Sequence, residues 1–176
     1  DGEEISLPKP THSRDGKNGM QKWVTLKKAL AGTRSKEWVE ISPDQLTYLK
    51  LLGPGQNWTS LPKKLQAKAL GGAYYSWGGR SGFSRRLAWN KPSPSLTTQP
   101  NGKATMLCHP VKDRPLSVEE YARIQEFPDD YTFVGSVSDK YVLIGNAVPL
   151  GLGRAIGGML MDTMIKVGEN GLPKDA

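Results

Sequence analysis

The chain has 176 residues, enough for one ordinary domain with its own core, and its single cysteine excludes an internal disulfide and a cysteine-cluster metal site. It shows neither an apolar run long enough to span a bilayer nor a signal-peptide pattern, so we expect no membrane partner, no metal and a cytoplasmic location. The net charge of +7 is segregated: residues 1–113 carry 18 basic and 8 acidic residues, whereas residues 114–176 carry 6 and 9.

Residues 1–20 are polar and interrupted by prolines and glycines, which predicts an extended N-terminal segment. The chain does not begin with methionine, so we expect a processed chain or, preferably, a piece of a longer one. Trp23, Leu26 and Leu30 then recur at helical spacing. This spacing predicts a short amphipathic helix over residues 23–30, with Trp23 as a core anchor.

Two more short helices are predicted before residue 71. Ser42 is placed as the N-cap of the first, with Pro43 at its first position, and the pattern runs to about residue 52. The second covers residues 63–70 and is closed by a Gly-Gly pair. We interpret the two as a small helical insert whose basic side lies along a phosphate backbone.

The sequence between Gln45 and Lys112 has no acidic residue. It holds ten basic residues: Lys50, Lys63, Lys64, Lys68, Arg80, Arg85, Arg86, Lys91, Lys103 and Lys112. Solvated surfaces normally mix both signs of charge, so the stretch predicts a polyanionic partner. Nucleic acid is the first candidate, and a merely basic face is the alternative.

Residues 73–98 interleave aromatic residues with glycines and arginines. We expect the aromatic side chains to fix this segment, the glycines to let backbone approach a ligand, and the arginines to donate to guanine edges or phosphates. Arg80, in a Gly-Gly-Arg-Ser-Gly loop, is predicted as a base reader. Arg85 and Arg86, just before an expected strand at 87–89, are predicted as a phosphate clamp, and Lys91 as a further DNA contact. The alternative is that these side chains are simply solvated.

A well-capped helix is predicted near residues 117–127. Ser117 and Glu120 have the spacing of a capping box, and Glu119 adds negative charge to the first turn. Pro128 is expected to stop the helix just after Phe127. The apolar residues that share one helical face are Val118, Tyr121, Ala122 and Ile124.

Two strings are more specific than any of these patterns. Residues 114–131 read Arg-Pro-Leu-Ser-Val-Glu-Glu-Tyr-Ala-Arg-Ile-Gln-Glu-Phe-Pro-Asp-Asp-Tyr, and residues 144–149 read Ile-Gly-Asn-Ala-Val-Pro. In this order and at this spacing they resemble the ninth and tenth shared motifs of DNA (cytosine-5) methyltransferases. Residues 10–13, Pro-Thr-His-Ser, resemble the segment that follows the eighth motif. The resemblance marks as motif residues Arg114, Glu120, Arg123, Phe127 and Pro128.

The resemblance implies a DNA-contacting segment. In the family, a variable target-recognition region ends in a Thr-Leu pair that touches the DNA backbone. Residues 92–98, Pro-Ser-Pro-Ser-Leu-Thr-Thr, match that ending, with Ser95 where threonine is usual. Ser95, Leu96 and Thr97 are therefore expected to contact DNA.

The resemblance also implies a cofactor segment. The start of the tenth motif borders the pocket for S-adenosylmethionine in the family, so Asn146, Ala147 and Val148 are expected to line it. The helix that follows is rich in glycine and carries an apolar face from Leu150 to Leu160. A plain packing helix would look the same, and the family adds that it docks on the catalytic half.

The catalytic elements of the family are missing from the sequence. The family reaction uses a cysteine thiolate in a Pro-Cys motif, and Cys108 lies between Leu107 and His109 instead, so we reject it as nucleophile. The sequence has no Phe-x-Gly-x-Gly, Pro-Cys-Gln, Glu-Asn-Val or Gln-Arg-Arg pattern. We therefore expect no catalytic residue here, no activity of the chain alone, and a partner that supplies the N-terminal catalytic half.

The expected fold class is α+β. After the segment 1–20, a small mixed target-recognition domain would cover residues 21–142, and residues 143–176 would complete a doubly wound α/β methyltransferase domain supplied by the missing half. The chain would then bind duplex DNA and select the target cytosine in a bacterial restriction-modification enzyme. A stand-alone DNA-binding module is the alternative, and an RNA-binding or ribosome-associated protein is a further rival.

Overall fold

The computed structural model describes residues 7–171. Residues 1–6 of the expected N-terminal segment 1–20 and residues 172–176 of the expected C-terminal segment 143–176 lie outside the described residues. The chain divides into two compact units, residues 24–147 and residues 1–23 with 148–176. Within residues 7–171 the structure is small and mixed, with strands of only two residues, several short helices and one long C-terminal helix. The larger unit includes residues 143–147, which the sequence analysis assigned to the C-terminal segment.

The described part of the smaller unit holds a pair of short strands and one helix. β1 (His12–Ser13) and β2 (Gln21–Lys22) form a short parallel pair, with His12 opposite Gln21. α6 (Leu150–Gly171) is the longest helix among the described residues. Trp23 is 45% exposed and lies under the guanidinium of Arg14, 5.5 Å from the ring centroid, so it is not the core anchor that the sequence predicted.

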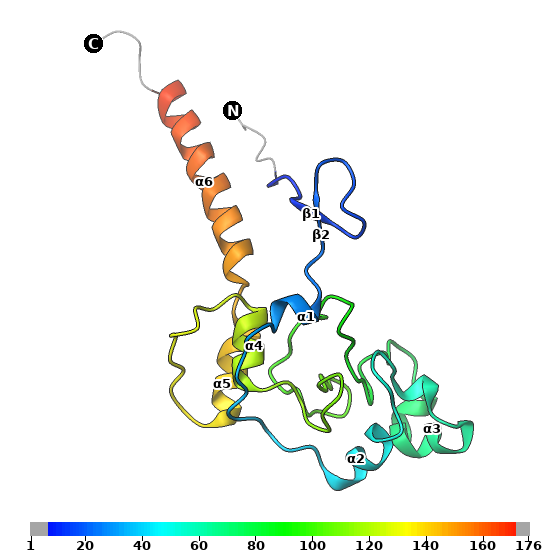
Figure 1. The fold of residues 1–176 in the computed structure, drawn as a ribbon. Helices are drawn as coiled ribbons and strands as arrows, with labels where there is room; N and C mark the ends of the chain where they lie inside the picture. Colours follow the sequence, from blue (N-terminus) through cyan, green and yellow to red (C-terminus); the bar gives the residue numbers. More distant parts are fainter. Residues whose placement is uncertain (1–6, 172–176) are drawn as a thin grey trace. The chain divides into compact units, whose positions relative to one another are not determined.

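One end of the larger unit is built from three helices: α1 (Leu26–Ala29), α4 (Val118–Ile124) and α5 (Val137–Asn146). α4 and α5 lie side by side (Figure 1). They enclose a hydrophobic cluster whose fully buried members include Leu26, Tyr121, Tyr141 and Ile144. The rings of Tyr121 and Tyr141 meet edge to face at 4.8 Å, an arrangement that aromatic pairs prefer.

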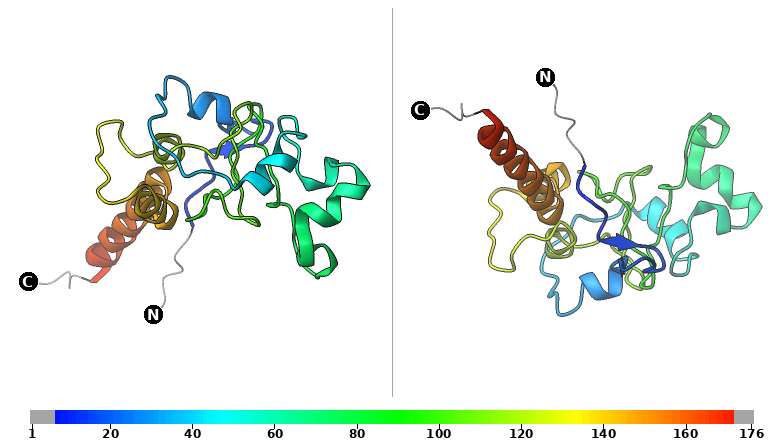
Figure 2. Two further views of the ribbon diagram at one scale, coloured as in Figure 1. Left: turned by 90° about the horizontal axis from the view of Figure 1, so that it is seen from below. Right: turned by 90° about the horizontal axis from the view of Figure 1, so that it is seen from above.

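The opposite end of the larger unit contains α2 (Pro43–Leu49), a 3-10 turn at Trp58–Ser60, α3 (Lys63–Leu70) and a second 3-10 turn at Gly71–Tyr75 (Figure 2). Ser42 caps α2 as predicted, by accepting from Gln45 N. Gly71 ends α3 with φ +61°, a conformation that favours glycine. The helical insert is thus confirmed, although α2 ends at Leu49 rather than near residue 52.

An extended segment joins the two ends. A second hydrophobic cluster, the α2–α3 cluster, includes Leu49, Leu61 and Leu70, and the cluster described above is the α4–α5 cluster. The side chains of the joining segment alternate, since Met106 and Cys108 lie in the α2–α3 cluster while Leu107 lies in the α4–α5 cluster. This is the period of two that extended backbone imposes. The strand expected at residues 87–89 does not form: the described pairing there is an isolated bridge of Arg86 with Cys108.

The predicted capping box is present at the start of α4. Ser117 Oγ accepts from Glu120 N at 3.2 Å, and Ser117 N donates to the Glu120 carboxylate at 2.7 Å. The helix ends at Ile124, three residues before the predicted position, because Glu126 adopts φ +64° and turns the chain out of the helix. Pro128 therefore follows the stop and does not cause it.

One stretch of the described chain, Val137–Lys166, has the length and composition of a membrane-crossing helix, with a mean hydropathy of 1.3 over its window. This corrects the expectation that no run is long enough. The stretch joins α5 and α6 across a break at Ala147–Pro149, and Tyr141 and Ile144 of α5 are buried in the larger unit. Length and composition alone are weak evidence of a membrane span, since the core helix of a soluble protein passes the same test.

Candidate nucleic-acid interface and cofactor segment

A buried ion pair fixes the start of α4. The guanidinium of Arg114 donates to both carboxylate oxygens of Glu120, each at 2.8 Å, and both residues are at most 6% exposed. Ser35 Oγ donates to the same carboxylate at 2.8 Å, and the ring of Trp38 lies 4.8 Å from the guanidinium carbon. Burial opposes the charged form of Glu120, but its hydrogen bonds with Arg114, Ser117 and Ser35 outweigh burial and hold its pKa below the ordinary value.

His109 and Cys108 lie next to this pair and are buried. His109 Nδ1 accepts from the backbone N–H groups of Val111 and Lys112 at 3.2 and 3.0 Å, which requires an unprotonated Nδ1. Burial lowers the pKa of His109 to about 4 and raises the pKa of the Cys108 thiol to about 12. A buried neutral thiol is a poor nucleophile.

Arg86 is a structural residue. It is 4% exposed, and its guanidinium donates to Asp113 and to the backbone carbonyl groups of Leu49, Leu52, His109 and Lys112 at 2.8–3.1 Å. These bonds tie α2 to the loop after Cys108. The guanidinium is thus enclosed by protein groups, and the phosphate contact expected for Arg86 stays a prediction.

Arg80 and Arg85 are only partly available. Arg80 donates to the carbonyl groups of Ala73 and Tyr74, and its guanidinium lies 5.5 Å from the centroid of the Trp58 ring. Arg85 Nε donates to Met106 O at 3.2 Å, and burial lowers the pKa of this half-buried guanidinium. Arg80 thus ties its own loop to residues 73 and 74, and its role as a base reader stays a prediction.

The aromatic residues of segment 73–98 divide into two groups. Tyr74, Phe83 and Trp89 pack against the two hydrophobic clusters, as expected for residues that fix the segment. Tyr75 and Trp77 are 80% and 103% exposed, so they do not anchor it. Sequence spacing gave no signal that separates the two groups.

The other residues predicted to contact DNA are exposed or half-buried. Lys91 and Ser95 are exposed, whereas Leu96 packs partly against the α4–α5 cluster and Thr97 is half-buried. Thr97 Oγ1 donates to Thr105 O at 3.4 Å. Lys63, Lys64 and Lys68 are exposed on α3.

The predicted cofactor segment begins where α5 ends. Asn146 is the last residue of α5 and is exposed, Ala147 is half-buried, and Val148 is 58% exposed. Gln125, the C-cap of α4, was not singled out from the sequence, yet its side chain bonds to this turn. The only signal for it was its place in the ninth motif.

The other residues of the ninth motif brace the loop after α4. Arg123 pairs with Asp129 at 2.7 Å, and the rings of Phe127, Tyr131 and Phe133 lie 4.8–5.0 Å apart. Pro128 is exposed. These contacts give the loop of residues 127–133 its shape.

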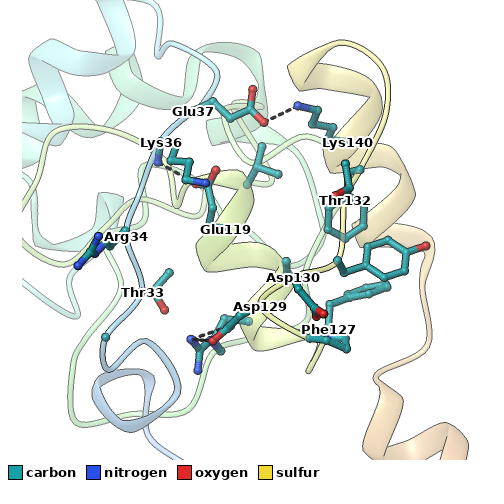
Figure 3. Close-up of a pocket in the computed structure, with 17 residues that line it drawn as sticks. Thr33, Arg34, Lys36, Glu37, Glu119, Phe127, Asp129, Asp130, Thr132 and Lys140 are labelled. Atoms are coloured by element: carbon teal, nitrogen blue, oxygen red, sulfur yellow. Dashed lines mark hydrogen bonds and ion pairs between the residues drawn. The ribbon is translucent and has the colours of Figure 1, made fainter.

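A hollow of about 560 Å³ lies between this loop, α4 and residues 32–37 (Figure 3). Lys140 pairs with Glu37 at 2.5 Å across its rim, and Lys36 N donates to Glu119 at 2.9 Å. None of the residues predicted to contact DNA lines it. No cluster of three or more His, Cys, Asp or Glu side chains suited to a metal occurs in the part of the chain that the structure describes.

Comparison with known proteins identifies the family. Residues 5–162 match the family model for C-5 cytosine-specific DNA methylases. The type II methyltransferase M.Sau96I of Staphylococcus aureus is 46% identical over 113 residues, which cover 64% of this chain and 26% of that protein. M.Eco47II of Escherichia coli is 44% identical over 121 residues (69% and 29%), and M.NgoFVII of Neisseria gonorrhoeae is 34% identical over 154 residues (84% and 38%).

The matched region thus spans between 26% and 38% of the length of these three relatives. The family model covers well over half of the chain, and it includes both strings that carried the resemblance in the sequence. The chain belongs to the family of C-5 cytosine-specific DNA methylases.

Proposed function

We propose that this chain is the target-recognition and C-terminal part of a DNA (cytosine-5) methyltransferase of the bacterial restriction-modification type. It binds duplex DNA and selects the target cytosine, while a catalytic half that this sequence does not contain transfers the methyl group from S-adenosylmethionine. The chain has no catalytic residue of its own in this account and is inactive alone. Residues 21–142 act as the recognition domain, and the segment from 143 onward serves the catalytic half.

The observation that carries the proposal is that the helix of the ninth motif packs on the helix in which the tenth motif begins. The ninth motif forms α4, whose start is held by the buried Arg114–Glu120 pair, and α4 lies against α5, which leads into the tenth motif. This places the exposed Asn146 at the end of a rigid two-helix support. Such a support is what a precisely positioned cofactor segment needs.

The charge distribution supports the DNA-binding part. Exposed lysines lie on α3, at the opposite end of the larger unit from α4 and α5, in a stretch without acidic residues. The exposed Tyr75 and Trp77 lie in the same stretch, and aromatic faces stack on bases. We assign one part of the interface to this region, with Arg80 and Arg85 as partly engaged members. We assign a second part to Lys91, Ser95, Leu96 and Thr97, which lie near α1 and the end of α5 and would contact the DNA backbone.

The exposed apolar face of α6 supports docking on a catalytic half. Leu152, Ile156 and Leu160 recur every fourth residue and are 52%, 39% and 46% exposed. A contiguous apolar face of this kind marks an interaction site in a soluble protein. In this account the apolar face of α6 packs against the catalytic half, and α6 thereby completes the cofactor pocket of that half.

Methyl transfer from labelled S-adenosylmethionine to bacterial DNA tests the proposal. The chain alone should show no transfer, its mixture with the catalytic half encoded upstream should show transfer, and Asn146→Ala should raise the KM for the cofactor. A mixture that forms a complex without activity would leave a stand-alone DNA-binding module as the better account.

DNA binding is tested separately by the salt dependence of the dissociation constant. Each lysine among Lys63, Lys64 and Lys68 that touches a phosphate should contribute about 0.9 to the slope of log K against log salt, so a triple alanine variant should lower the slope by up to about 3. Lys27 and Lys28 of α1 provide the control, since they are also exposed. An unchanged slope in the α3 variant would remove α3 from the interface.

A further inference from the structure

Gln125 makes two hydrogen bonds that connect the helix of the ninth motif to the start of the tenth. Its Nε2 donates to Ile144 O and to Ala147 O, both at 2.8 Å. Gln125 is 6% exposed; its bond to Ile144 O is buried, and its bond to Ala147 O is partly buried. Both donors of one amide are thus used on carbonyl groups that flank residues 145 and 146.

These bonds act where α5 ends. The last carbonyl groups of a helix lack partners within the helix, and their direction depends on what caps them. Ala147 leaves the helix with φ −70° and ψ 143°, and its N–H donates to Ile144 O at 3.2 Å. Gln125 adds a donor to the same carbonyl and to the one that follows the turn. The backbone on either side of the exposed Asn146 is therefore held by a side chain from another helix.

Gly145 lets a second element reach the same turn. A Cβ at this position would lie 2.9 Å from the carbonyl carbon and oxygen of Thr97 and from Thr98 N. The backbone that follows Ser95 and Leu96 thus packs directly on the end of α5. The turn is thus contacted by two elements: Thr97 and Thr98 pack against Gly145, and Gln125 supplies hydrogen bonds to the carbonyl groups of Ile144 and Ala147.

We propose that Gln125 is a positioning residue for S-adenosylmethionine: it fixes the backbone of residues 144–147 so that Asn146, Ala147 and Val148 meet the cofactor. This rests on the proposed function, because it requires that the segment binds the cofactor. Gln125 itself does not touch the cofactor. Its effect arises because binding weakens when a ligand-contacting segment loses its fixed geometry.

The test compares Gln125→Met with a matched control in the mixture of this chain and the catalytic half. Gln66 on α3 is the control, because its Nε2 also donates to two carbonyl groups, Thr59 O at 3.1 Å and Leu61 O at 2.9 Å, at the opposite end of the unit. Methionine keeps the length of either side chain and removes both donors. The KM for S-adenosylmethionine and the KM for DNA are measured for each variant.

Gln125→Met should raise the KM for S-adenosylmethionine about tenfold and change the KM for DNA less than about twofold. Gln66→Met should leave the KM for S-adenosylmethionine within about twofold. Equal effects of the two variants on the cofactor KM, or no effect of Gln125→Met, would overturn the inference. If thermal unfolding shows that Gln125→Met does not fold, Gln125→Asn takes its place in the assay. Asparagine keeps the amide group on a side chain that is one methylene group shorter.

The same assay separates this inference from the proposed function. If Asn146→Ala weakens cofactor use and the Gln125 variants do not, the segment binds the cofactor without help from Gln125, and only the inference fails. If Asn146→Ala has no effect on the cofactor KM of an active mixture, the cofactor segment is misassigned and both fail. Faster amide hydrogen exchange at Asn146 and Ala147 in the Gln125→Met mixture would support the positioning role independently of activity.

Discussion

Replacement of Glu120 by glutamine should destabilise the larger unit strongly, although the change removes only a charge. The carboxylate is 4% exposed and accepts bonds from Arg114, Ser35 and Ser117. Glutamine keeps one oxygen that can accept from Ser117 N, so the capping box is largely preserved. The main loss is the partner of the buried Arg114 guanidinium.

The structure sets the size of the effect. Removal of one partner from a buried, hydrogen-bonded ion pair costs about 3–5 kcal/mol, because the other charge stays buried without compensation. For a chain of this length, each kcal/mol lowers the melting temperature by about 2–4 °C. We expect Glu120→Gln to lower it by roughly 10 °C.

Thermal unfolding followed by circular dichroism measures this, with Glu119→Gln as the matched control. Glu119 lies in the same first helical turn, but its bond to Lys36 N is solvent-exposed, so its replacement should cost less than about 1 kcal/mol. The double replacement Arg114→Met with Glu120→Leu should recover most of the loss, since it removes both charges. Equal melting temperatures for Glu120→Gln and Glu119→Gln would refute the reasoning.

Three further predictions follow from particular contacts. Arg86→Met should lower the free energy of unfolding in urea by about 3 kcal/mol, because it leaves backbone carbonyl groups unpaired. The control, Lys91→Met at an exposed position, should change it by less than about 0.5 kcal/mol. Similar values for the two variants would contradict the burial of Arg86. Stability should fall as the pH is lowered from about 6.5 to about 4, because His109 is protonated in this range in the unfolded chain but stays neutral in the folded one, where its pKa is about 4. His109→Gln should flatten this part of the curve of stability against pH. An unchanged curve would rule out His109 as its cause. Gly145→Ala should cost about 1–3 kcal/mol in the same unfolding assay, since its Cβ meets the backbone of Thr97, and a neutral result would show that this segment shifts freely.

Local elements were predictable where a short stretch contains all the groups that form them. Ser117 and Glu120 satisfy each other's backbone N–H groups within one turn, and Ser42 and Gly71 act on the ends of their own helices. The predicted end of α4 was wrong, because Pro128 was expected to stop the helix just after Phe127. The left-handed conformation of Glu126, which a sequence pattern does not announce, ends the helix earlier.

Arg85 and Arg86 show the limit of reasoning from charge. Both are basic residues in a stretch without carboxylates, and the sequence offered no reason to separate them. The partners of Arg86 come from residues 49, 52, 109, 112 and 113, so its burial depends on contacts across more than twenty positions. Trp23 and Trp77 were likewise assigned to anchoring roles that their surroundings do not provide.

The sequence by itself determined the family, because two strings of fixed order and spacing are specific without any knowledge of packing. It also determined the segregation of charge and the helix caps, since these depend on neighbours in the chain. Only the tertiary structure decided that Arg86 is buried among backbone carbonyl groups, and that Gln125 donates hydrogen bonds to the turn after α5. Those properties arise from desolvation and from hydrogen bonds between residues distant in sequence, and such pairs exist only once the chain has folded.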